Sequence, residues 1–306
     1  MKKINDETRM VKKDRLKKYA LALVFISILV TCIFFLNYES KDSITLTQFS
    51  PTTSSQMMGY AIKTSNNKII IIDGGTKGDT KEIKSYIDSN GSKVDAWILT
   101  HPHKDHVGVF ENIIQDENIK INKVYNSFYP ESFIPKSNTR DSIESEEFYT
   151  SIKNWKNNNV IEEVSLNQEI NIDNIKIKIL GVKNEFITEN LLNNSSLVFK
   201  VYVNDKSVLF LGDSGIEKGQ WLLDNVKDDL KSDYVQMAHH GQAGISEQVY
   251  KQINPKFCLW PTPEWLWNNK NGSGTYKTQE TKQWMENLNV IGNYVAKDGL
   301  CNIKIK

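Results

Sequence analysis

A short stretch of the sequence concentrates side chains that can hold metal ions. Three of the five histidines lie within six residues, in the run His101, Pro102, His103, Lys104, Asp105 and His106. Imidazole nitrogens and a carboxylate are ligands that suit Zn²⁺. Alternate residues of an extended segment point the same way, so His101 and His103 could share one ion, and Asp105 and His106 would face a neighbouring position. The run predicts a metal site; the alternative is a solvated polar loop.

Further candidate residues follow other apolar runs. Asp213 directly follows LFLG, and its two carboxylate oxygens could bridge two cations; the alternative is an N-cap for the next helix. Neighbours in an extended segment point oppositely, so one of His239 and His240 should bind the metal and the other should face the substrate; we assign His240 to the metal and His239 to the substrate. The alternative for His239 is a buried histidine satisfied by the backbone. Asp73, before two glycines, is predicted to orient a ligand histidine, with turn formation as the alternative.

The sequence resembles the metallo-β-lactamase superfamily, whose HxHxDH motif is matched at the 101–106 run. Three shorter matches occur in the family's order: IIDGG ending at Gly75, LFLGD ending at Asp213 and MAHHG ending at Gly241. The resemblance implies an αββα sandwich, an α/β fold, with a dinuclear metal site. We expect two Zn²⁺ ions, with Mn²⁺ as the alternative, held by His101, His103, Asp105, His106, Asp213 and His240.

One histidine that many members of this superfamily use is missing from the sequence. The chain has no histidine between His106 and His239, and the corresponding stretch, residues 193–198, reads NNSSLV. We place Asn194 and Ser195 of this stretch beside the ligands rather than among them. One ion then keeps an open coordination position for water or a substrate oxygen. The sequence therefore argues against β-lactam hydrolysis.

This departure resembles two narrower groups: the metallohydrolase domain of DNA-uptake channel proteins, and the phosphorylcholine esterases of choline-decorated Gram-positive cell walls. The esterases are the closer match, through AHHGQAG and the following segment up to EWLW, which ends at Trp267. Channel-linked domains usually carry aspartate at the position of His103. The chain departs from the esterases because it lacks C-terminal aromatic choline-binding repeats and has a predicted membrane anchor in their place.

Three tryptophans, Trp260, Trp265 and Trp267, lie within eight residues of this segment. Aromatic faces attract quaternary ammonium groups, and each contact contributes about 0.5 to 2 kcal/mol. We predict that Trp265 and Trp267 contact the substrate and that Glu264 adds an anion near its ammonium group. The alternatives are core packing for the tryptophans, favoured for Trp260 at the end of a predicted strand, and a solvated Glu264.

The elements that must position these residues alternate between short strands and amphipathic helices, which predicts one α/β domain over residues 43–306. The predicted strands include residues 68–73, 94–100, 175–180, 196–203, 207–212, 234–238 and 257–260. The predicted helices are residues 81–89, 107–115, 142–157, 217–230, 246–253 and 278–288. The chemistry-bearing residues fall just after strands, where open α/β sheets build their sites.

The N-terminal region differs in charge and hydropathy from the rest. Residues 1–18 carry eight Lys or Arg against three acids, and residues 19–36 form an almost unbroken apolar run. This pattern predicts a cytoplasmic tail, one transmembrane helix and an extracellular domain. The remaining chain is slightly acidic, so nucleic acid ranks below other partners. Three cysteines are too few for a disulfide framework, although Cys258 and Cys301 could pair.

Together these observations predict a membrane-anchored, extracellular di-zinc phosphodiesterase. Its substrate would be phosphorylcholine or a similar phosphoester of a cell-surface polymer, or a small phosphodiester. Asp105, Asp213 and His239 are the predicted catalytic residues. The alternatives are an extracellular nuclease of the DNA-uptake type and a non-catalytic surface-binding module. The sequence does not indicate the oligomeric state.

Overall fold

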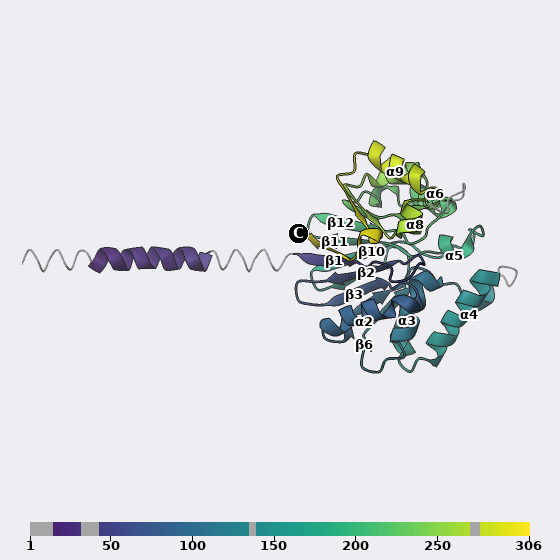
Figure 1. Ribbon diagram of the computed structural model, residues 1–306, viewed down its shortest axis with the longest axis horizontal. Helices are drawn as coiled ribbons and strands as arrows, with labels where there is room; N and C mark the ends of the chain where they lie inside the picture. Colours follow the sequence, from purple (N-terminus) through teal and green to yellow (C-terminus); the bar gives the residue numbers. More distant parts are fainter. Residues whose placement is uncertain (1–14, 32–42, 135–138, 270–275) are drawn as a thin grey trace, which may run out of the picture. The chain divides into compact units, whose positions relative to one another are not determined.

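The computed structural model describes residues 15–31, 43–134, 139–269 and 276–306. The chain forms two separate units, Met1–Ser43 and Ile44–Lys306 (Figure 1). In the first unit, residues 15–31 are helical. Within the described ranges, no helix has both the length and the apolar character of a membrane span. The predicted span over residues 19–36 continues into residues 32–36, which lie outside the described ranges, and it stays a prediction.

Two seven-stranded sheets form the centre of the second unit. The first has the order β16 (Cys301–Ile305), β1 (Ile44–Gln48), β2 (Gly59–Lys63), β3 (Ile69–Asp73), β5 (Ala96–Ile98), β7 (Val124–Asn126) and β8 (Ile161–Glu163). The second has the order β15 (Gly292–Val295), β14 (Phe257–Trp260), β13 (Tyr234–Gln236), β12 (Lys206–Phe210), β11 (Val198–Val203), β10 (Ile175–Gly181) and β9 (Glu169–Ile172). A separate pair joins β4 (Lys93–Val94) and β6 (Lys120–Ile121).

Helices cover the outer faces of both sheets (Figure 1). The first sheet carries α2 (Thr80–Ser89), α3 (Lys104–Ile113) and α4 (Thr139–Asn154). The second carries α6 (Ile216–Asn225), α7 (Glu247–Ile253) and α9 (Thr278–Asn287), and α5 (Leu191–Asn194) and α8 (Glu264–Trp267) are short. Single 3₁₀ turns are η1 (Lys77–Asp79), η2 (Glu131–Phe133), η3 (Asn158–Val160), η4 (Lys227–Asp229), η5 (Ala238–Gly241) and η6 (Ala296–Asp298).

The core between the two sheets is apolar, and it explains the strand sequences. Tyr60 of the first sheet and Phe210 of the second pack edge to face, with ring centroids 5.4 Å apart. All five residues of β3, IIIID, are buried, because one face of the strand meets the other sheet and the opposite face meets helices. The predicted αββα sandwich is therefore confirmed. The predicted strands 196–203 and 207–212 correspond to β11 and β12, which pair antiparallel with Phe199 opposite Phe210.

The strand directions bring the chemistry-bearing residues to one edge of the sandwich. β3 and β5 are parallel neighbours in the first sheet, and β12 and β13 are parallel neighbours in the second. Asp73 ends β3, the histidine-rich run follows β5, Asp213 follows β12, and the histidine pair follows β13. All four segments therefore leave the carboxyl ends of their strands, as predicted for an open α/β sheet.

Candidate metal centre

The structure brings all six predicted ligand residues together in the buried interior. One ligand atom from each of His101, His106 and Asp213 lies within 4.8 Å of the others, and the same holds for Asp105, His106 and His240. His103 adjoins the first group, since its Nδ1 is 3.0 Å from His101 Nε2. These residues come from two sheets, which explains why the sequence alone could not show that they meet.

The local backbone explains how the 101–106 run presents its ligands. His103 is extended, with φ −73° and ψ 144°, and it forms the N-cap of α3. Its carbonyl accepts hydrogen bonds from the backbone N–H groups of His106 and Val107. Helix α3 thus begins at Lys104, three residues before the predicted start, and Asp105 and His106 lie on its first turn.

The separations between ligand atoms fit a divalent metal. A tetrahedral zinc ion with bonds of about 2.0 to 2.1 Å would place neighbouring ligand atoms roughly 3.3 Å apart. His106 Nε2 is 3.3 Å from Asp213 Oδ1, and His240 Nε2 is 3.3 Å from Asp105 Oδ2. His240 Nε2 is also 3.5 Å from Asp213 Oδ2. The donor set of imidazoles and carboxylates therefore has both the chemistry and the spacing that such an ion needs.

Buried atoms of the cluster lack hydrogen-bond partners. Within the described part of the chain these atoms include Asp105 Oδ1, His106 Nε2, Asp213 Oδ1 and His240 Nε2. A buried polar atom without a partner costs about 1 to 3 kcal/mol, so four in one place need an explanation. A bound cation would satisfy all four. The residues present therefore fit a metal.

The electrostatics of the cluster also favour positive charge. Burial alone would lower the pKa of His106 and of His240. The nearby carboxylates, Asp213 among them, together have the larger effect, and they raise the pKa of His106 well above its ordinary value and that of His240 to about 9. Burial likewise opposes ionisation of Asp213, yet His106 and His240 hold its pKa well below the usual range. The carboxylates thus stay ionised and attract protons or a metal ion.

Asp73 lies where it can orient one ligand histidine. Its Oδ2 is 2.8 Å from His106 Nδ1, and both side chains are fully buried. Asp73 also accepts hydrogen bonds from the backbone N–H and the hydroxyl of Thr100, at 2.8 and 2.7 Å. These contacts direct His106 Nε2 toward Asp213. The predicted role of Asp73 as an orienting residue agrees with this geometry, and the histidine is His106.

The side chain of Asn194 holds the turn after Asp213, and the N-cap role given as the alternative for Asp213 is not observed. The N-cap of α6 is Gly215 rather than Asp213, and the Gly215 N–H donates to Asn194 Oδ1 at 2.9 Å. Ser195 donates its hydroxyl to Leu192 O. Asn194 thus supports the backbone just after Asp213, and among the hydrogen bonds between described residues neither side chain contacts a ligand atom; the supporting role of both residues stays a prediction.

Ser196, which the sequence analysis missed, is the residue of this stretch that reaches the centre. Its Oγ lies 3.4 Å from His101 Nδ1 and accepts the Asp213 backbone N–H at 3.0 Å. A Cβ on Gly212 would lie 2.7 Å from this oxygen, so glycine permits the close approach. In the sequence, the only indication of this role was the pair Ser195 and Ser196, and the pair does not show which of the two serines points toward the centre.

The side chains of His239 and His240 point in different directions, as predicted, but the backbone conformation that causes this differs from the prediction. They are not extended: His239 and His240 both adopt left-handed backbone conformations, with φ 50° and 54°, inside turn η5. His240 is buried, and its Nδ1 lies 3.0 Å from Pro261 O. His239 Nε2 is 3.8 Å from Asp213 Oδ2, and 23% of its side chain is exposed. His240 therefore faces the ligands, and His239 lies at the open side.

Helix α4 contributes a residue that the sequence analysis did not single out. Asp141 Oδ1 lies 3.0 Å from His103 Nε2, and both side chains are buried. This contact leaves His103 Nδ1 directed at His101. Asp141 and His103 are separated by 38 residues, and nothing in the sequence around Asp141 marks it as part of the site.

The tryptophan segment differs from its prediction. Trp260 is buried and packs edge to face with Trp267, at 5.2 Å between ring centroids. The Lys282 ammonium lies 3.6 Å from the Trp267 ring centroid, so a cation of the chain itself occupies this face. Trp267 is therefore not open to a substrate cation there, contrary to the prediction. Trp265 and Glu264 do line a cavity of about 350 Å³.

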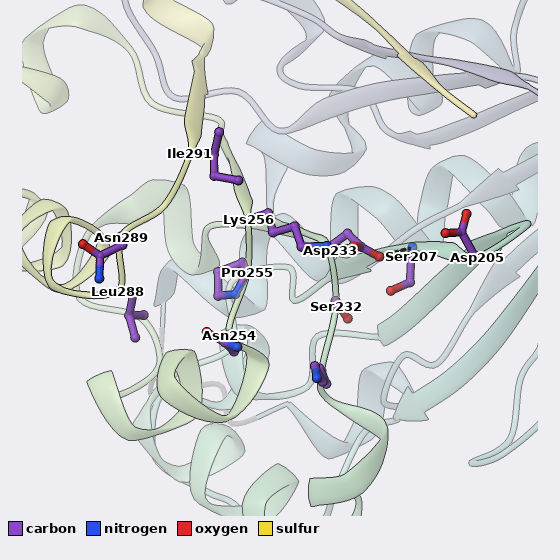
Figure 2. A pocket seen from close by; sticks show the side chains of 11 residues that line it. Asp205, Ser207, Ser232, Asp233, Asn254, Pro255, Lys256, Leu288, Asn289 and Ile291 are labelled. Atoms are coloured by element: carbon purple, nitrogen blue, oxygen red, sulfur yellow. Dashed lines mark hydrogen bonds and ion pairs between the residues drawn. The ribbon is translucent and has the colours of Figure 1, made fainter.

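A second pocket, of about 540 Å³, lies at the opposite ends of the strands (Figure 2). Ser207, Asp233 and Lys256 line it, near the starts of β12, β13 and β14. Lys256 Nζ and Asp233 Oδ1 pair at 3.0 Å. Among the described residues that line this pocket, none is a histidine. It is therefore separate from the metal centre, which lies after the strand ends.

Comparisons with known proteins agree with the fold and the ligand cluster. The sequence model of a family described as the metallo-beta-lactamase superfamily matches residues 59–256. The chain belongs to this superfamily. This membership and the His/Asp cluster assign it to the metallo-hydrolases with a site for a divalent metal.

One relative in this superfamily is ComE operon protein 3 of Bacillus subtilis (strain 168), which is 28% identical over 181 residues. The match covers 58% of this chain and 21% of that protein, so the chain spans about a fifth of its relative's length.

Two solved structures share the fold. The metallo-beta-lactamase fold protein YhfI from Bacillus subtilis has a TM-score of 0.53 at 12% identity, covering 86% of this chain and 100% of that chain. The diiron β-hydroxylase CmlA from Streptomyces venezuelae has a TM-score of 0.50 at 10% identity, covering 87% of this chain and 54% of that chain. At these identities the likeness concerns the fold alone.

Proposed function

We propose that the chain is a dinuclear metal-dependent phosphodiesterase. The observation that carries the proposal is the position of Asp213 between two groups of histidines. Its Oδ1 lies 3.3 Å from His106 Nε2, and its Oδ2 lies 3.5 Å from His240 Nε2 and 3.9 Å from His101 Nε2. A carboxylate with both oxygens surrounded in this way is suited to bridging two cations.

In this proposal each residue of the centre has a separate task. His101, His103 and Asp213 would hold one ion, and Asp105, His106, His240 and Asp213 would hold the second. We propose Zn²⁺ for both, with Mn²⁺ as the alternative. When bound, the ions would supply a nucleophile from water at neutral pH and neutralise charge on the phosphoryl group.

Other residues orient the ligands and meet the substrate. Asp73 fixes the ring of His106, and Asp141 fixes the ring of His103. His239 lies at the open side, where its N–H can donate a hydrogen bond to a phosphoryl oxygen or to the leaving group. Burial lowers the pKa of His239, so the ring is neutral near pH 7 and carries one N–H.

The proposed substrate is a phosphorylcholine-type phosphoester of a cell-surface polymer, or a small phosphodiester. The cavity lined by Trp265 and Glu264 supports this choice, because an aromatic side chain and a carboxylate suit a quaternary ammonium group; Lys297 lines the same cavity. The segment is also close in sequence to the centre, since Pro261, whose carbonyl contacts His240, precedes Trp265 by four residues. We further propose that the N-terminal helix anchors the enzyme in the membrane with the hydrolase domain outside.

A nuclease of the DNA-uptake type is the second candidate. The match to ComE operon protein 3 favours it. Plasmid DNA and p-nitrophenyl-phosphorylcholine, digested side by side by the metal-loaded enzyme, separate the two substrates. A non-catalytic binding module would hydrolyse neither compound and would not bind metal in stoichiometric amounts.

The experiment that tests the proposal is Asp213→Ala, compared with Asp205→Ala, an acid that lines the separate pocket (Figure 2). Hydrolysis of bis(p-nitrophenyl) phosphate and the metal content of each variant would be measured. We expect Asp213→Ala to lose both turnover and metal, and Asp205→Ala to keep both. An Asp213→Ala variant with wild-type rate and full metal content would contradict the proposal.

A further inference from the structure

We propose that Arg140 binds a non-bridging oxygen of an anionic phosphodiester at the metal centre. The site would then select substrates whose reacting phosphoryl group carries a negative charge. This inference rests on the proposed function and specifies the substrate class. Arg140 lies on the first turn of α4, directly before the orienting residue Asp141.

The residue type is itself informative. The chain has 38 lysines and arginines, of which only Arg9, Arg15 and Arg140 are arginines. Arg140 is therefore the single arginine in the sequence of the second unit, Ile44–Lys306, where lysine supplies every other permanent cation. A guanidinium presents a planar fork of N–H donors that matches two phosphate oxygens, whereas an ammonium acts as a point charge.

The guanidinium lies beside the ligand cluster. Arg140 Nη2 is 3.8 Å from Asp105 Oδ1, and 59% of the Arg140 side chain is exposed. Asp105 belongs to the group of ligands that also contains His106 and His240, both of which are buried. Arg140 thus stands on the solvent side of the centre, where a substrate must enter.

A buried carboxylate fixes one edge of the guanidinium. Arg140 Nε donates to Glu144 Oε1 at 3.0 Å, and the other oxygen of Glu144 accepts the Lys104 backbone N–H at 3.0 Å. Among the hydrogen bonds between described residues, none uses the Nη donors of Arg140, because 3.8 Å to Asp105 exceeds hydrogen-bond distance. The Glu144 contact therefore holds the guanidinium in place, and its Nη groups can donate hydrogen bonds to an oxygen of an incoming substrate.

A purely supporting role for Arg140 is the rival explanation. Arg140 would then serve only to pair with Glu144 and to balance the charge of Asp105. The pair with Glu144 uses Nε and leaves the Nη groups on the side of Asp105, and a metal ion on Asp105 would itself supply positive charge there. A phosphodiester shares one negative charge between two non-bridging oxygens, and hydrogen bonds to such oxygens are about twice as strong as neutral ones.

The test uses the full-length, metal-loaded protein with Arg140→Gln. The control is Lys153→Gln, which removes one positive charge from the last turn of the same helix. Two substrates are compared: anionic bis(p-nitrophenyl) phosphate and neutral diethyl p-nitrophenyl phosphate. We expect kcat/KM for the anionic diester to fall about 10- to 100-fold in Arg140→Gln, and that for the neutral triester to change by less than about twofold. Metal content and both rates of Lys153→Gln should equal those of the wild type.

Two further measurements keep the outcome decisive. Arg140→Lys retains the positive charge but lacks the planar pair of N–H donors, so its rate with the diester should lie between those of the wild type and Arg140→Gln. Equal losses with diester and triester in Arg140→Gln, or loss of metal, would overturn the inference. If the wild type hydrolyses neither substrate, the proposed function fails, and the Kd of orthophosphate then tests Arg140 by itself. A Kd weaker by about tenfold in Arg140→Gln supports the inference, and an unchanged Kd refutes it.

Discussion

Removal of the Asp141 carboxylate should weaken metal binding without removing any ligand. The 3.0 Å contact between Asp141 Oδ1 and His103 Nε2 is buried, and it keeps His103 Nδ1 directed at His101. A hydrogen bond to a charged group contributes about 1.5 to 3 kcal/mol, which corresponds to roughly 10- to 100-fold in an equilibrium constant. We therefore expect Asp141→Ala to bind metal about 10- to 100-fold more weakly. Asp141→Asn keeps an acceptor oxygen and should lose less.

The assay is competition for Zn²⁺ against a chromophoric chelator, with Glu146→Ala as the control. Glu146 is exposed on the same helix, so its removal tests for a general effect of charge on α4. Folding of each variant would be checked by circular dichroism. An Asp141→Ala variant with wild-type affinity, or an equal loss in Glu146→Ala, would refute the reasoning about the His103 ring.

Two further predictions concern pH. Burial lowers the pKa of Lys218 to about 7, so between pH 7 and about 10.4 the unfolded chain binds a proton that the native state lacks. Urea unfolding should show wild-type stability rising relative to Lys218→Met by at most about 1.4 kcal/mol per pH unit in this window, and a constant difference would contradict the prediction. Although burial opposes it, Asp213 raises the pKa of His240 to about 9, so a metal must displace a proton at lower pH. Apparent Zn²⁺ affinity should therefore rise from pH 6 to pH 8, and an affinity that does not vary with pH would count against His240 as a ligand.

Residues close together in the sequence were the most predictable part of the site. The 101–106 run carries four candidate ligands on one strand-to-helix connection, so their proximity follows from local geometry. Asp213 and His240 each follow an apolar strand, and both belong to short sequence matches to the family, LFLGD and MAHHG. The αββα layers were likewise predictable, because buried strands such as IIIID alternate with amphipathic helices along the chain.

Contacts between distant segments were not predictable. Asp141 and Ser196 reach the centre only because α4 and the segment before β11 pack beside it, and neither residue type is distinctive in the sequence. Lys282 covers Trp267 from a separate helix, which no local pattern could indicate. The predicted strands also omitted β1 and β16, which pair the start of the second unit with the C-terminal segment.

The backbone at His239 and His240 shows where a general rule fails. Alternation of side chains assumes an extended chain, but both residues adopt left-handed conformations, which are uncommon for residues other than glycine. Gly241 continues the turn with φ 78°, and a Cβ at this position would lie 2.4 Å from the Trp260 ring. A tight turn, rather than strand alternation, separates the two rings.

The most direct test of the central claim is the metal-to-protein ratio of the purified chain, measured by elemental analysis after equilibration with Zn²⁺ and removal of unbound metal. We predict two zinc ions per chain in the wild type and a clear loss in Asp213→Ala, because Asp213 faces both ligand groups. A ratio of zero, or a ratio of two that survives Asp213→Ala unchanged, would contradict a dinuclear centre bridged by this carboxylate.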